Sequence, residues 1–244
     1  MDETLLTALA LIPALVIAIV FHEVAHGWTA LALGDPTAKE RKRLSLNPIR
    51  HVDPFGTLIL PGLLYLSGLP TFGWAKPVPV IKQRLRNPRF GMMAVAAAGP
   101  ATNMILATLA AIALGGLVWA FAPGADAAGF LGYLAEGYSP NPATGVGFAL
   151  TAVYSFMLIN LFLALFNLLP IPPFDGSHVV EGLLPRRAAR AYQKLHRVGF
   201  LLLIALLVVV PYFFPRLGIV ERVVLPPVLW VLDGFLAIAS WIAL

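Results

Sequence analysis

Long uncharged apolar runs alternate along the chain with short segments rich in lysine and arginine. About 20 apolar residues are enough to cross a bilayer as an α-helix, which satisfies its own backbone hydrogen bonds. The pattern therefore predicts an all-α polytopic membrane protein with about five transmembrane helices, in a range of roughly four to six. The runs that carry this prediction are Leu5–Leu33, Phe90–Ala125, Asn141–Phe174, Val198–Pro215 and Val223–Leu244.

A shorter apolar segment, Pro54–Pro70, lies between the first two of these runs. Glycine and proline interrupt it, and it is shorter than a usual span. We therefore expect a re-entrant or interfacial hairpin that enters and leaves on one side of the membrane. The alternative is a true span, which would move one basic segment to the opposite side.

The basic residues predict the orientation of the helices. Three segments, residues 34–53, 76–89 and 186–197, carry five lysines and arginines each, and so hold 15 of the 17 in the chain. Loops rich in these residues stay in the cytoplasm in most membrane proteins. With a hairpin at Pro54–Pro70, all three segments face the cytoplasm and the N-terminus is external.

The composition agrees with a membrane protein and leaves no room for a large soluble domain. Apolar residues make up 59% of the 244 residues, and charged residues make up 12%, about half the usual fraction in soluble domains. We expect one integral-membrane domain over residues 1–244, with a core at about 5–215 and an apolar tail at 216–244. The net charge of +5 could suggest nucleic acid, but its distribution indicates contact with the lipid bilayer and no nucleic acid partner.

Three ionisable side chains interrupt the first apolar run, within the sequence HEVAH, at His22, Glu23 and His26. Successive residues of an α-helix are rotated by about 100°, so the two histidines lie about 40° apart and one turn from each other. Two such imidazoles can bind one cation with a carboxylate beside them, which is the H-E-x-x-H zinc pattern. Ionisable residues inside a span are costly and usually functional. The alternative is that the three side chains only hydrogen bond to neighbouring helices.

A catalytic zinc ion usually has three protein ligands, and the absence of cysteine limits the third to a histidine or a carboxylate. Asp175 has the most favourable context, because the prolines of NLLPIPPFDG end the preceding helix just before it. It is then at the cytoplasmic end of its span, on the same side as His22. Asp233 lacks such a break, and we interpret it as a polar contact of the helix bundle or as part of an interfacial helix.

Four further side chains stay open as third ligands, with simpler interpretations beside that role. Asp53 is expected to cap a turn, and His178 to be a second-shell partner or an ordinary polar loop residue. His196 lies among basic residues and is expected to face solvent or lipid headgroups. His51, close to Asp53 in the chain, could approach the site through the hairpin.

Three ordered motifs, FHEVAHGWTALALGD, AAGPATN and NLLPIPPFDG, together resemble the site-2 protease family of intramembrane zinc metalloproteases. GWAKPV is also similar to a subgroup of that family. The resemblance covers about residues 16–185. The connector between the second and third runs is short and the tail is apolar, so we expect a compact form without a PDZ domain or a C-terminal regulatory domain.

The resemblance implies that His22, His26 and Asp175 bind one zinc ion per chain and that Glu23 is the catalytic base. The expected function is regulated intramembrane proteolysis, in which peptide bonds within or near transmembrane helices of membrane proteins are hydrolysed. The protein is expected to be a multi-pass protein of the cell membrane with its active site near the cytoplasmic face.

The resemblance also suggests that Asn103 and Asn167 bind substrate or stabilise an oxyanion. An interhelical hydrogen bond is the alternative for each, because an amide inside a membrane needs partners. Two other functions remain open from the residues alone, a zinc hydrolase acting on a non-peptide substrate and a metal transporter. The scarcity of ionisable residues in the outer halves of the spans disfavours the transporter. The substrate, the regulator and the oligomeric state do not follow from the sequence.

Overall fold

The computed structural model describes residues 3–66, 74–121, 127–135, 144–214, 218, 222 and 225–244. Every regular element within these ranges is helical, which confirms the predicted all-α class. Four of the described helices are long and apolar enough to cross a membrane, a number inside the predicted range. These helices are α1 (Glu3–Ala32), α4 (Pro88–Phe121), α6 (Gly145–Asn167) and α11 (Leu225–Ala243).

The apolar run Val198–Pro215, which we counted as a span, forms three consecutive helical segments that end at Phe213. These are α9 (Gly199–Ile204), η5 (Ala205–Val209) and α10 (Val210–Phe213). The run from Gly199 to Phe213 is shorter than the roughly 20 residues that a span needs. It is accordingly not among the four candidate spans.

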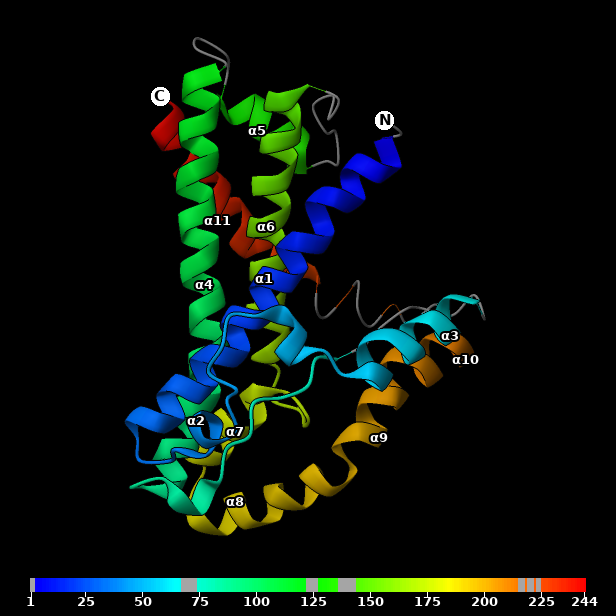
Figure 1. Cartoon of the computed structure of the whole chain (residues 1–244). Helices are drawn as coiled ribbons and strands as arrows, with labels where there is room; N and C mark the ends of the chain where they lie inside the picture. The colour runs from blue at the N-terminus through cyan, green and yellow to red at the C-terminus, as the bar shows by residue number, and fades with distance from the viewer. Residues whose placement is uncertain are drawn as a thin grey trace. The chain divides into compact units, whose positions relative to one another are not determined.

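The chain forms two compact units, and the first contains residues 1–18, 103–164 and 225–244. Its core consists of apolar side chains from α4, α6 and α11 and from the short helix α5 (Ala127–Ala135). Figure 1 shows α4 and α6 running alongside each other. Leu114, Met157 and Leu232 are fully buried between these helices, so they give the unit a tightly packed interior.

The second unit contains residues 19–102 and 165–224, and it includes all three basic segments. Its short helical elements are α2 (Thr37–Glu40), η1 (Pro48–His51), η2 (Pro54–Ile59), α3 (Leu60–Leu66), η3 (Lys82–Arg84), α7 (Asp175–Leu183), α8 (Arg186–Tyr192) and η4 (Gln193–Val198), followed by α9, η5 and α10.

The buried carboxylate of Asp35 holds the loop after α1 to the segment before η3. It accepts hydrogen bonds from Thr37 and, at 2.6 Å, from the backbone N–H of Ile81. Burial acts to raise the pKa of Asp35, but these hydrogen bonds keep it below its usual value. The extended segment that follows Trp74 is thereby fixed against the end of α1.

The segment Pro54–Pro70 begins as a helix, and the part after residue 66 lies outside the described residues. The chain is described again from Trp74, whose N–H donates to the carbonyl of Gly56 at 3.1 Å. Lys76 likewise donates to the carbonyl of His51. Trp74 and Lys76 thus lie beside Gly56 and His51, and the choice between a hairpin and a span falls on residues that lie outside the described part of the chain.

Candidate active site

The side chains of His22, His26 and Asp175 converge in the second unit. Oδ2 of Asp175 lies 3.1 Å from Nε2 of His22 and 3.3 Å from Nε2 of His26. The two imidazoles, one turn apart on α1, meet edge to face with ring centroids 4.7 Å apart. In zinc sites with bonds of about 2.0–2.1 Å, tetrahedral ligand atoms lie about 3.3 Å from each other. The spacing of the three side chains therefore fits a zinc ion.

The hydrogen bonding of His26 also fits a cation at this place. Its Nδ1 lies 2.7 Å from the carbonyl oxygen of Val95, an acceptor, so Nδ1 carries the proton and donates it. In the neutral ring, Nε2 then has a lone pair that faces Oδ2 of Asp175. Both atoms are acceptors, so they need either a cation between them or a second proton on the ring. A histidine that ligates a metal is commonly oriented by such a bond from its other nitrogen.

Gly99 of α4 leaves the space that an ion next to the histidines would need. A methyl group at this position would lie 2.5 Å from Nε2 of His26 and 2.6 Å from Nε2 of His22. Any residue other than glycine would therefore require an imidazole or the backbone of α4 to move. The motif AAGPATN thus contributes to the site through the absence of a side chain.

Asp175 reaches the histidines because α6 ends and α7 begins within a short proline-rich turn. Asp175 is the first residue of α7, where a carboxylate interacts favourably with the helix dipole. The next residue, Gly176, allows close approach, since a methyl group there would collide with the carbonyl of Leu168 and lie 2.6 Å from that of Leu169. Burial would raise the pKa of Asp175, but the contacts with His22 and His26 lower it, so the group is a carboxylate.

Glu23 lies beside the histidines on α1 and is held by the backbone of the segment GWAKPV. Its Oε2 accepts a hydrogen bond of 2.7 Å from the N–H of Val78. Glu23 is not one of the three converging side chains, which is the arrangement expected for a proton-transfer group rather than a metal ligand.

Among the described residues, the other candidate ligands are not members of this cluster. His51 contacts the carbonyl of Ser45 at 2.7 Å, and Asp53 caps η2 by accepting from two backbone N–H groups, as expected. Asp233 is exposed on α11 and belongs to the first unit. His178 and His196 form a second group, with the buried Glu181. His196 is thus packed against protein, in contrast to the expected solvent or headgroup contact.

The two asparagines have different surroundings. Asn103 is fully buried in the first unit, and its amide donates to Oδ1 of Asn160 at 2.8 Å and is 3.5 Å from the carbonyl of Ala18. This is the interhelical hydrogen bonding that the sequence left open as an alternative. Asn167 is half-buried at the last residue of α6.

Two residues with a place in these clusters were not singled out from the sequence. Gly99 carries no functional group, so only its position in the matched motif AAGPATN could have pointed to it. Glu181 lies one turn after His178, a spacing that places both on one face of a helix. Its burial, which makes a carboxylate significant, becomes visible only in the fold.

The comparisons with known proteins agree with this geometry. The model of "Peptidase family M50" matches residues 10–210. "Putative zinc metalloprotease YwhC" of Bacillus subtilis is 36% identical over 213 residues, which cover 85% of this chain and 86% of that protein. "Putative zinc metalloprotease Rip2" of Mycolicibacterium smegmatis is 31% identical over 188 residues, or 77% of this chain and 62% of that protein. No solved structure was found to match the chain.

Proposed function

The chain belongs to peptidase family M50, and on this premise we propose that it hydrolyses peptide bonds of membrane proteins with a zinc ion bound by His22, His26 and Asp175. The observation that carries the proposal is that the Nε2 atoms of both histidines lie close to Oδ2 of Asp175, which is 153 residues after His22 in the chain. A zinc ion supplies the acidity that makes a water molecule nucleophilic near neutral pH and polarises the carbonyl of the substrate.

Glu23 is the group that we assign to proton transfer. The hydrogen bond from Val78 holds its Oε2, which fixes the direction of the carboxylate next to the two histidines. Glu23 accepts a proton from the attacking water and passes it to the leaving amine. General acid–base groups of this kind contribute about 10²- to 10⁴-fold to the rate.

The substrate class that fits this site is a transmembrane helix. The histidines lie in an apolar helix that is long enough to span the membrane, so the peptide bond has to reach them within or near the bilayer. An intact helix hides its carbonyls in internal hydrogen bonds. Cleavage therefore requires local unwinding, and helix-breaking residues near the scissile bond of the substrate should promote it.

We place the active site near the cytoplasmic face and the N-terminus outside. The three basic segments, which hold 15 of the 17 lysines and arginines, belong to the same unit as His22, His26 and Asp175. Residues of this kind concentrate on the cytoplasmic side of membrane proteins. The two units form one catalytic domain in this proposal, because α1, α4 and α6 each continue from one unit into the other.

Replacing Asp175 tests the assignment of the third ligand, with Asp233 as the matched control. Asp233 is also followed by glycine, but it is exposed on α11. We expect Asp175→Ala to lose zinc and cleavage of a tagged single-span substrate in lipid vesicles, by more than about 100-fold, since outer-sphere changes alone cost roughly 10- to 100-fold. Asp233→Asn should stay within a few-fold of the unchanged protein. The opposite pattern would show that the ligand was assigned to the wrong aspartate.

A further inference from the structure

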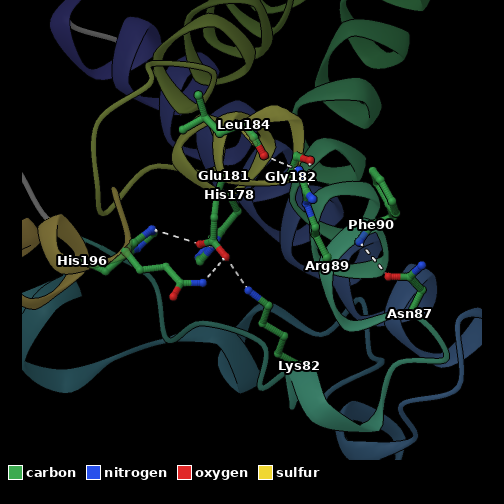
Figure 2. A network of polar contacts seen from close by, with 10 residues as sticks. Lys82, Asn87, Arg89, Phe90, His178, Glu181, Gly182, Leu184 and His196 are labelled. Carbon is green, nitrogen blue, oxygen red and sulfur yellow. Dashed lines mark hydrogen bonds and ion pairs between the residues drawn. The ribbon is translucent and has the colours of Figure 1, made fainter. Parts of the chain in front are cut away.

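A second group of potential metal ligands lies one turn along α7 from Asp175. His178 and Glu181, three residues apart, lie on the same face of α7, and His196 comes from η4. Figure 2 shows the carboxylate of Glu181 between Lys82 and His196. Within the described residues, this group and the His22 group are the two sets of histidine and carboxylate side chains that could hold an ion.

The distances within this group match those between zinc ligands. Oε2 of Glu181 lies 3.7 Å from Nδ1 of His178 and 3.5 Å from Nε2 of His196. Tetrahedral zinc with bonds of about 2.0–2.1 Å separates its ligand atoms by about 3.3 Å. The two imidazole rings are stacked with centroids 4.6 Å apart, and a nitrogen of each lies near the same carboxylate oxygen.

The two histidine nitrogens that face Glu181 are buried and have no hydrogen-bond partner. Buried polar atoms are rarely left in this state, and a bound ion is one of the standard explanations. Burial is the main cause that lowers the pKa of both His178 and His196, while the charge of Glu181 acts to raise it.

The other oxygen of Glu181 is occupied in a way that suits a metal ligand. Oε1 accepts hydrogen bonds from Nζ of Lys82 at 2.5 Å and from Nε2 of Gln193 at 2.7 Å. These bonds fix the carboxylate and direct Oε2 toward the two rings. Carboxylates that ligate metals are typically held by outer partners in this way.

We propose that His178, Glu181 and His196 bind a second divalent transition-metal ion of the zinc type, separate from the active-site zinc. The ion joins α7 to η4 and so fixes the helix whose first residue is Asp175. This raises the expected content from one zinc ion per chain to two. The charges predict the order of binding. The cation of Lys82 offsets the charge of Glu181, whereas the carboxylate of Asp175 contacts His22 and His26. The active site should therefore fill first.

A zinc titration of the full-length protein counts the sites. The protein is prepared without an affinity tag, stripped with a chelator and titrated with Zn²⁺ against a competing fluorescent chelator. We expect two equivalents, the second weaker than the first. His178→Ala and His196→Gln should each weaken the second equivalent by more than about 100-fold, because each removes a direct ligand and outer partners alone are worth roughly 10- to 100-fold. The first equivalent should be unchanged.

His51→Ala is the matched control, because it removes a buried histidine of the same unit that contacts the carbonyl of Ser45 and belongs to neither group. It should keep both equivalents. Co²⁺ gives a second readout on the unaltered protein, in which the chain without cysteine confines the visible bands to nitrogen and oxygen ligands. Two spectrally distinct Co²⁺ sites are expected.

The outcomes separate this inference from the proposed function. A single equivalent that is lost in His22→Ala but kept in His178→Ala would overturn the second site and leave the proposed function standing. Two equivalents that are both unaffected by His178→Ala and His196→Gln would also overturn it. Loss of stability in these variants with an unchanged zinc count would assign the cluster to a polar contact between α7 and η4. An absence of any equivalent that depends on His22 would instead contradict the proposed function.

Discussion

Gly99→Ala should disable the site by adding a single methyl group. The new carbon would lie 2.5 Å from Nε2 of His26 and 2.6 Å from Nε2 of His22. Nonbonded atoms of this size settle at about 3.5 Å, so the methyl group is about 1 Å too close to both nitrogens. Ligand distances in a working metal site hold to about 0.2 Å, so the required displacement is about five times that tolerance.

The strain has two routes of escape, and each harms the site. Either an imidazole turns away from the position that ligates the ion, or α4 moves away from α1. The second route lengthens the 2.7 Å hydrogen bond between His26 and the carbonyl of Val95, which orients the imidazole. We therefore expect zinc affinity to fall by more than about 100-fold, beyond the loss caused by removing an outer partner alone.

The assay is competition for zinc against a fluorescent chelator, together with cleavage of a single-span substrate, on the same purified protein. Gly116→Ala is the control, because Gly116 lies in the same helix with nothing within 4 Å of the added carbon. It should keep wild-type affinity and gain about 0.5–1 kcal/mol of stability. Wild-type affinity in Gly99→Ala would show that the space between Gly99 and the two histidines does not hold the ion.

Two further outcomes follow from the fold and the charge distribution. Asn103→Ala should lower stability by about 0.6–1.7 kcal/mol, the range found for interhelical hydrogen bonds in a membrane, because it removes the partner of Asn160. Zinc binding should stay unchanged. A loss of activity at unchanged melting temperature would instead indicate a catalytic role. Because the chain has no cysteine of its own, single cysteines can be labelled with thiol reagents. Glu40→Cys should react only with thiol reagents that reach the cytoplasm, and Phe130→Cys only with reagents added outside. The reverse labelling would contradict the proposed orientation.

The convergence of His22, His26 and Asp175 could be expected from the sequence because its signals are local. His22 and His26 are one helical turn apart, so α-helix geometry alone brings them to one face. Asp175 could be chosen over Asp233 because the prolines before it break a helix, and the fold brings Asp175, not Asp233, to the histidines. Four of the five apolar runs that predicted spans form long helices, because run length and low charge are also local signals.

The features that the sequence did not predict depend on packing between segments that are distant in the chain. Nothing local indicates that Gly99 faces two histidines, or that His196 stacks on His178 around a buried carboxylate. The run Val198–Pro215 shows the limit of hydropathy, since its composition resembles a span but the helix ends at Phe213. Where a helix ends depends on its surroundings as well as on its apolar content.

Glu23→Gln tests the central claim most directly, because it separates zinc binding from proton transfer on one preparation. The amide keeps the size of the side chain and can still accept the hydrogen bond from Val78, but it cannot take up a proton. Zinc content and cleavage of a transmembrane substrate are measured together in lipid vesicles. We predict wild-type zinc content at the active site with cleavage reduced by about 10²- to 10⁴-fold. Cleavage within a few-fold of the unchanged protein would contradict the mechanism, and loss of zinc together with activity would make Glu23 a ligand instead of the base.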